Sequence, residues 1–279
     1  MNKIPFSIPT DKPLSVNTDI YYGDYDAKKP ISIVIHGFKG FRNWGFIPFL
    51  SESISKDIGP SINIDFSHNG IKRDDKIIEY DVSLFRKNTV SKMLDEIQLL
   101  ISKIEKGEID KEIYKIWNGE IYLLGHSLGG ALSILTASEN NLVKKICIWG
   151  TISDLDRNTD RQKKIWKEEG IMEFKDNTSG QDLILNVSYL LDKENNVKRF
   201  NLKDKISSLS IPICIIHGTQ DFTVRLKEAK ELVEASKSNP NMKYFFIEKC
   251  GHTFGIRHPF EQSNPQLDEA VKISKEFLS

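Results

Sequence analysis

Long hydrophobic runs are missing from this 279-residue sequence, and so is any excess of charge of one sign. No apolar stretch approaches the roughly 20 residues that span a lipid bilayer. The 39 Lys and Arg residues balance 39 Asp and Glu residues, which gives a formal net charge of zero. Proteins that bind nucleic acids usually carry a basic excess or a basic stripe. We therefore expect neither a nucleic acid nor a membrane as a partner.

Cysteine is scarce as well. The three cysteines, Cys147, Cys214 and Cys250, are odd in number, and their spacing matches no metal-binding pattern. The N-terminal residues contain no apolar core of the roughly 7 to 15 residues typical of a secretory signal. These absences predict free, buried thiols in a cytoplasmic protein. Coiled-coil heptads are also missing, and the sequence does not predict an oligomeric state.

Short apolar runs rich in β-branched residues alternate with amphipathic segments along most of the chain. Strands are expected at residues 14–22, 31–35, 62–64, 120–124, 143–149, 211–216 and 243–247. Helices are expected at 90–107, 128–138, 227–237 and 266–278. Strands that alternate with helices predict an α/β fold with a mostly parallel central sheet flanked by helices.

Residues 151–208 break this alternation, because they are polar and interrupted by Gly170 and Gly180. We interpret them as a lid or cap insertion in a core built from residues 1–150 and 209–279. The insertion is expected to cover the site and to decide substrate preference, with Trp166 and Phe174 as possible pocket residues.

One segment carries a pattern associated with nucleophilic serine. Residues 125–129 read Gly-His-Ser-Leu-Gly, which matches the G-x-S-x-G turn between a buried strand and a helix. The two glycines allow the strand and the helix to approach closely, and the strained turn exposes the serine. The pattern predicts Ser127 as a nucleophile, and we expect the ring of His126 to point away from the site.

A serine hydroxyl needs a general base, and six histidines compete for this role. His252 follows the last predicted strand, whose loop lies at the same edge of the sheet as the serine turn. His258 is the nearest rival. His36 and His217 each end a strand before a glycine, where we expect them to hold their turns. His68 has no clear assignment.

The histidine needs a carboxylate that fixes its tautomer and stabilises its cationic form. Asp221 follows the next-to-last predicted strand, at the same edge of the sheet. Asp154 and Asp156 follow the preceding strand and are the alternatives. The chain order Ser127, Asp221, His252 is the order found in α/β hydrolases.

Acyl transfer also needs hydrogen-bond donors aimed at the developing oxyanion. We expect the backbone N–H groups of Leu128 and Phe38 to supply them, Phe38 from the loop of residues 36–41, the predicted oxyanion loop. Phe41, Trp44 and Trp149 are candidates for the wall of a substrate pocket.

Four segments together resemble a known superfamily: residues 36–41, 125–130, 217–221 and 251–254. The chain is similar to the α/β-hydrolase superfamily, most of all to its bacterial serine esterase branch, which is related to dienelactone-hydrolase-like and acyl-aminoacyl-peptidase-like groups. The resemblance implies the α/β-hydrolase fold and a Ser-His-Asp triad, with no metal and no cofactor. Dienelactone hydrolases have cysteine where this chain has Ser127, which favours ester hydrolysis.

These observations predict hydrolysis of a small-molecule carboxylic ester through an acyl-enzyme on Ser127. A thioester or a peptide or amide bond as the substrate of the same triad is the first alternative. A non-catalytic binding protein that uses the pocket as a ligand site is the second.

Overall fold

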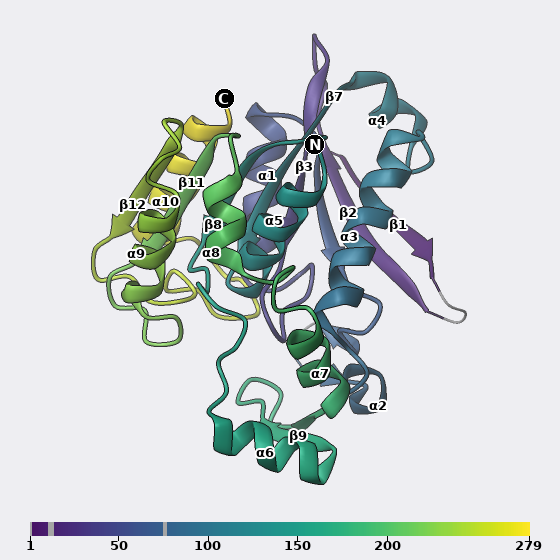
Figure 1. Cartoon of the computed structure of the whole chain (residues 1–279). Coiled ribbons are helices and arrows are strands. Elements are labelled where there is room, and N and C mark those ends of the chain that lie inside the picture. Colours follow the sequence, from purple (N-terminus) through teal and green to yellow (C-terminus); the bar gives the residue numbers. More distant parts are fainter. Residues whose placement is uncertain (1, 11–13, 75–76) are drawn as a thin grey trace.

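A computed structural model describes residues 2–10, 14–74 and 77–279 (Figure 1). Its largest sheet has eight strands in the order β1-β2-β4-β3-β7-β8-β11-β12. The strands are β1 Asn2–Pro9, β2 Ser15–Tyr22, β3 Lys29–Ile35, β4 Ser61–Asp65, β7 Trp117–His126, β8 Val143–Trp149, β11 Ile213–Gly218 and β12 Met242–Ile247. The first two pairings are antiparallel and the other five are parallel, which confirms the predicted mostly parallel sheet.

Strand β1 at one edge of the sheet is not among the strands expected from the sequence. It contains Pro5 and Pro9, and most of its side chains are exposed or half-buried. Proline is tolerated on an edge strand because one row of N–H groups there has no partner strand. A strand of this kind shows no apolar run, and the hydrophobic pattern therefore gives no sign of it.

Helices cover both faces of the sheet and bury two separate cores. One core contains residues of α3 Val90–Glu105, α5 Leu128–Glu139, α8 Leu202–Ser208 and α9 Leu226–Ala235, and the other contains residues of α1 Ile47–Asp57 and α10 Pro265–Leu278. Successive residues of β3 alternate between them, with Ile33 and Ile35 in the first core and Val34 in the second. Burial on both faces explains why the central strands read as continuous apolar runs.

Several smaller elements stand outside these layers. They are α2 Val82–Phe85, α4 Lys111–Ile116, α6 Asp160–Glu169, α7 Val187–Asn195, the hairpin of β5 Ile71–Asp74 and β6 Ile78–Tyr80, and the hairpin of β9 Ile171–Lys175 and β10 Asp182–Asn186. Figure 1 shows α6, β9 and α7 together beyond one end of the sheet. Helix α8, which also lies within residues 151–208, packs against α5 and α9. The extent of a cap within this segment stays a prediction.

All three cysteines are buried and free, as the sequence predicts. Among the helices in the described part of the chain, none combines the length and the apolar composition that crossing a bilayer requires.

Candidate active site

Ser127 occupies the turn between β7 and α5 in a conformation that side chains other than glycine rarely adopt, with φ of 57° and ψ of −118°. Its N–H donates to the carbonyl of Trp149 on β8 at 2.8 Å. A Cβ atom on Gly125 would lie 2.2 Å from the carbonyl oxygen of Gly129. A Cβ atom on Gly129 would lie 2.1 Å from the carbonyl oxygen of Ile35. Glycine at both positions is therefore required for this turn.

The loops after β11 and β12 bring Asp221 and His252 together. His252 Nδ1 lies 2.7 Å from Asp221 Oδ2, and the Asp221 side chain is fully buried. Because an ionised carboxylate only accepts hydrogen bonds, the proton of a neutral His252 lies on Nδ1. The lone pair is then on Nε2, and this is the tautomer that a general base needs.

The carboxylate of Asp221 is held ionised by its surroundings. Burial, the largest influence, acts to raise the pKa of Asp221, but hydrogen bonds from His252 and from the Val224 N–H outweigh it, and the pKa lies below its usual value. Asp221 Oδ1 accepts from the N–H groups of Thr223 at 2.9 Å and Val224 at 2.8 Å. His217 Nε2 donates to the Val224 carbonyl at 2.9 Å, which ties the same turn to β11. His217 therefore holds its turn, as we expect from the sequence.

Ser127 and His252 line one cavity of about 390 Å³. Phe38, Trp44, Tyr80 and Thr223 are among the other residues of its wall. The cavity thus combines the predicted nucleophile and base with an aromatic lining.

The predicted oxyanion loop runs beside Ser127. A Cβ atom on Gly37 would lie only 3.0 Å from the Cβ atom of Ser127, so that a larger residue would push the loop away. Within the loop, the Gly40 N–H donates to the Gly37 carbonyl at 2.9 Å and closes a turn around Phe38. Leu128 is the first residue of α5, where backbone N–H groups have no partner within the helix.

The expectation for His126 is wrong. His126 is among the residues that line the cavity, and its ring lies 4.7 Å from the ring of His252, centroid to centroid. His126 Nε2 donates to the carbonyl of His252 at 2.9 Å. Burial, assisted by the neighbouring His252, lowers the pKa of His126 to about 3. The ring is therefore neutral at ordinary pH, with its proton on Nε2.

Two of the three predicted pocket residues are in the wrong place. Phe41 is fully buried, with its ring 5.0 Å from that of His258. Trp149 is buried in the core beneath α10, where its Nε1 donates to Ser274 at 3.0 Å. Its neighbour Ile148 faces the other core, and the alternation of side chains along a strand explains the placement. Trp44 does line the cavity, and its contact with a substrate stays a prediction.

The rivals of the predicted base and acid lie elsewhere. His258 bridges two loops, accepting from the Gly45 N–H at 3.1 Å and lying 3.0 Å from the Asp74 carbonyl. Asp154 and Asp156 line a different cavity of about 360 Å³, beside α7 and α8.

The two pocket candidates within residues 151–208 are Trp166 and Phe174. Trp166 is buried, and its Nε1 lies 3.2 Å from the Leu185 carbonyl. The ring of Phe174 packs 5.4 Å from that of Phe38.

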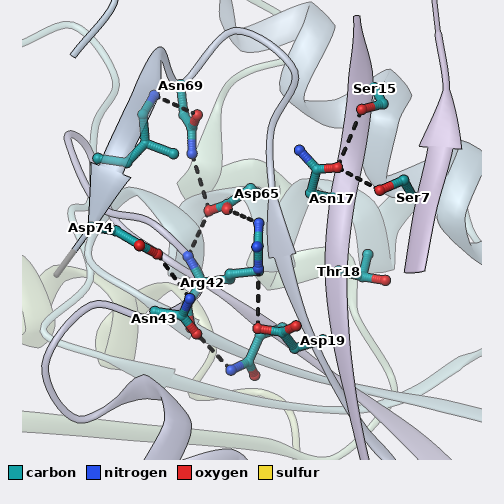
Figure 2. Close-up of polar contacts among 12 residues, drawn as sticks. Ser7, Ser15, Asn17, Thr18, Asp19, Arg42, Asn43, Asp65, Asn69 and Asp74 are labelled. Atoms are coloured by element: carbon teal, nitrogen blue, oxygen red, sulfur yellow. Dashed lines mark hydrogen bonds and ion pairs between the residues drawn. The ribbon is translucent and has the colours of Figure 1, made fainter. Parts of the chain in front are cut away.

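A network of charged groups fixes the chain just after the oxyanion loop (Figure 2). Arg42 contacts Asp65 on β4 through both its guanidinium and its N–H, the latter at 2.6 Å, and its Nε donates to Asp19 on β2 at 3.0 Å. His36, at the start of the loop, lies 4.0 Å from Asp65, Nε2 to Oδ1. Burial raises the pKa of Asp65 to about 6, although Arg42 opposes the shift. Arg42, directly after the loop, is therefore bonded to Asp65, whereas His36 lies near the same carboxyl group without a hydrogen bond to it.

Sequence reasoning missed four residues that shape the site: His126, Lys39, Tyr80 and Asp176. All four line the cavity. The elbow motif does locate His126, but its orientation depends on the loop after β12. Tyr80 and Asp176 come from the two small hairpins, whose positions no local pattern indicates. Within residues 2–10, 14–74 and 77–279, no group of three or more His, Cys, Asp or Glu side chains is arranged to hold a metal ion.

No protein-family model and no curated protein matches this chain by sequence. Solved structures do match its fold. Est1E from Butyrivibrio proteoclasticus is 19% identical, with a TM-score of 0.70 over 98% of this chain and 97% of that one. A structure of ferulic acid bound to Est1E gives 22% identity and a TM-score of 0.69, again over 98% and 97%. The mouse alpha/beta hydrolase domain-containing protein 10 is 15% identical, with a TM-score of 0.70 over 99% and 98%. The chain therefore has the α/β-hydrolase fold.

Proposed function

We propose that this protein is a serine hydrolase that cleaves a small carboxylic ester through an acyl-enzyme on Ser127. The observation that carries the proposal is the 2.7 Å hydrogen bond between His252 and the buried Asp221, beside a cavity that His252 shares with Ser127. A buried carboxylate, a histidine in the tautomer of a base and a serine in a strained turn are the parts that nucleophilic catalysis requires.

In the first half of the reaction, Ser127 Oγ attacks the carbonyl carbon of the ester while His252 Nε2 accepts its proton. Asp221 stabilises the imidazolium that forms. The C–O bond to the leaving group then breaks, and His252 passes the proton to the departing alcohol. The product of this half is an ester between the acyl group and Ser127.

In the second half, water attacks the acyl-enzyme, with His252 again accepting and then returning the proton. The tetrahedral oxyanion in both halves is stabilised by the N–H groups of Leu128 and Phe38. Leu128 is the first residue of α5, and the partial positive charge at the N-terminus of this helix favours an anion there.

The cavity favours a small substrate with an apolar, planar group. Its volume is about 390 Å³, and Phe38, Trp44 and Tyr80 supply aromatic walls. Est1E has been solved with ferulic acid bound, and this supports an ester of an aromatic acid as a test substrate beside simple acetates.

The nucleophile is tested by labelling the purified protein with a fluorophosphonate and measuring its intact mass. We expect the wild type to gain one label and the variants Ser127→Ala and His252→Ala to gain none. Ser127→Ala should lower kcat by about 10⁴- to 10⁶-fold. Folded wild-type protein that takes up no label would refute the proposal and favour a binding protein with the same fold.

The acid is tested by Asp221→Asn, which should lower kcat by about 10⁴-fold because the histidine loses its orienting carboxylate. Asp154→Asn is the matched control, since Asp154 lines the other cavity. Equal loss in the two variants would show that the assignment of Asp221 is wrong.

The substrate class is tested separately. Rates of hydrolysis of p-nitrophenyl acetate, a ferulate ester, an acyl-CoA and a peptide anilide rank esters, thioesters and amides as substrates. A dominant rate on the anilide would overturn the ester assignment.

A further inference from the structure

Lys39 in the oxyanion loop has a backbone conformation that needs support. Its φ is 62°, in the left-handed region that residues with a Cβ atom rarely adopt. Such a conformation persists where the surrounding structure holds it in place, and it is frequent at functional sites. Lys39 directly follows Phe38, the predicted donor to the oxyanion, and therefore its conformation sets the direction of the loop at that point.

The side chain of Lys39 is held by the β9–β10 hairpin. Lys39 Nζ donates to Asp176 Oδ1 at 2.7 Å, and the Asp176 side chain is only 3% exposed. Asp176 lies at the turn that follows β9, and its other oxygen accepts from both the N–H and the hydroxyl of Ser179 at 2.8 Å. The carboxylate is therefore fixed within the hairpin turn and presents one oxygen to the loop.

The main chain of Lys39 is held by a second contact that leads back to the same hairpin. Tyr80 on β6 donates its hydroxyl to the Lys39 carbonyl at 2.6 Å. The side chain of Gln181, from the hairpin turn, accepts from the Tyr80 N–H at 2.8 Å and donates to the Tyr80 carbonyl at 3.2 Å. Together with the Lys39–Asp176 contact, these hydrogen bonds form one network that joins the oxyanion loop, β6 and the β9–β10 hairpin.

Phe38 itself contacts the same segment. Its ring lies 5.4 Å from the ring of Phe174 on β9 and 6.5 Å from that of Tyr189 on α7. Two consecutive residues of the oxyanion loop thus pack against residues 171–189, part of the segment that the sequence predicts as a lid that covers the site and decides substrate preference.

We propose that Asp176 is a positioning residue that acts through Lys39 to hold the oxyanion loop in the shape that aims the Phe38 N–H at the reacting oxygen. The β9–β10 hairpin then completes the catalytic apparatus and does more than enclose the cavity. This inference rests on the proposed function, because it assigns a role in the reaction of Ser127.

The test compares Asp176→Asn, Lys39→Met and the double variant with the wild type in steady-state hydrolysis of p-nitrophenyl acetate. A displaced donor weakens stabilisation of the transition state far more than binding of the substrate. We therefore expect kcat to fall by about 10- to 100-fold in each single variant, with KM nearly unchanged. The double variant should resemble the single ones, because both changes remove the same contact.

Arg199→Met is the matched control. Arg199 also joins residues 151–208 to the core through an ion pair, with Glu139 at the end of α5, at 2.8 Å. It does not contact the oxyanion loop, and its replacement should leave kcat unchanged. Lys39→Arg keeps a cation that can reach Asp176 and should restore most of the activity.

Hydrogen exchange of residues 36–41, measured by mass spectrometry, supplies a readout that does not depend on activity. We expect faster exchange in Asp176→Asn than in the wild type and in Arg199→Met. Unchanged exchange and unchanged kcat in Asp176→Asn would overturn the inference. A wild type that neither hydrolyses esters nor takes up the fluorophosphonate would refute the proposed function, whereas faster exchange in Asp176→Asn would still show that the hairpin holds the loop.

Discussion

His126, the residue before Ser127, contributes a hydrogen bond to the main chain of His252 at 2.9 Å. The bond links the serine turn to the loop that carries the proposed base. Burial keeps the ring neutral over the ordinary pH range, and the carbonyl of His252 fixes the proton of the neutral ring on Nε2. The spacing between Ser127 and His252 therefore depends on a side chain that takes no part in proton transfer.

We predict that His126→Ala lowers kcat by about 10-fold, since small displacements of a catalytic group are costly. The amide nitrogen of Gln can reach a position similar to that of Nε2, and His126→Gln should retain more activity than the alanine variant. Steady-state kinetics on both variants checks the order. His68→Gln, at a histidine outside the cavity, is the control, and full activity of His126→Ala would show that the bond is dispensable.

Single glycines decide whether the serine turn forms at all. A methyl group on Gly129 would meet the carbonyl oxygens of Ile35 and His36 at 2.1 and 2.6 Å, and backbone atoms cannot move aside as a side chain can. We predict that Gly129→Ala costs at least about 3 kcal/mol in the free energy of unfolding.

Gly23→Ala is the control for this prediction, because the nearest atom to its added methyl group is 4.0 Å away. We expect the free energy of unfolding of that variant to stay unchanged or to rise by up to about 1 kcal/mol. Urea unfolding of the two variants provides the comparison. Equal stabilities would mean that the serine turn tolerates a Cβ atom at Gly129.

Local sequence patterns predict many of the individual residues of the candidate site. Ser127 and Asp221 follow buried strands, His252 follows the half-exposed edge strand β12, and the carboxyl ends of parallel strands meet at one edge of a sheet. The prediction for Trp149 is wrong because the side chain of an apolar residue at a strand end can point to either face of the sheet. The orientation of His126 was missed because it is set by contact with a loop more than a hundred residues further along the chain.

At the scale of elements, Asp65 on β4 lies near both ends of the oxyanion loop, bonded to Arg42 after one end and 4.0 Å from His36 at the other. His36 at one end is 4% exposed, and burial lowers its pKa to about 4 from an ordinary 6.5. In the unfolded chain His36 takes up a proton as the pH falls below 6.5, whereas in the folded protein it does not do so until about pH 4. Its contribution to stability is therefore present above pH 6.5 and is lost as the pH falls toward 4.

Protonation of Asp65 changes the stability of the protein in the opposite direction over nearly the same pH range. Its pKa is about 6 in the folded protein and 3.8 ordinarily, and the folded state therefore binds the proton first as the pH falls. Acidification from pH 6 to pH 4 consequently increases its contribution to stability. The contributions of the two neighbouring groups offset each other.

We predict that His36→Gln makes stability less sensitive to acid and that Asp65→Asn makes it more sensitive. The difference from the wild type between pH 7 and pH 4.5 should be on the order of 1 to 3 kcal/mol in each case. Free energies of unfolding from urea titrations at pH 7, 5.5 and 4.5 test the signs, and each variant's value at pH 7 serves as its own reference. A change of slope in the same direction for both variants would contradict the prediction.

The strands of the central sheet other than β1 can be predicted from the hydrophobic pattern, and the elements of residues 151–208 cannot. Central strands such as β8 and β11 are buried on both faces and read as apolar runs. The two strands of the β9–β10 hairpin are half exposed, and their buried residues are Leu183 and Leu185. Its position is set by the contacts of Asp176 and Gln181 with distant segments, and such contacts leave no trace in local sequence.

At the scale of the whole molecule, the two cores lie on opposite faces of one sheet and position the site between them. The elbow sits where β7 passes into α5 of the first core, and Trp149, whose carbonyl accepts from Ser127, is buried in the second. Packing on both faces therefore supports the turn. The fold class could be predicted because alternation of strands and helices is a property of the entire chain.

The buried state of all three cysteines has a practical consequence for the hairpin. The protein presents no exposed thiol of its own, and a cysteine introduced at the exposed Asn177, beside Asp176, would be the single accessible target for a maleimide dye. A fluorophore at that position would sit at the tip of the hairpin, next to the contact with Lys39. Its emission would then report in real time whether the hairpin stays in place or swings aside while a substrate enters and a product leaves.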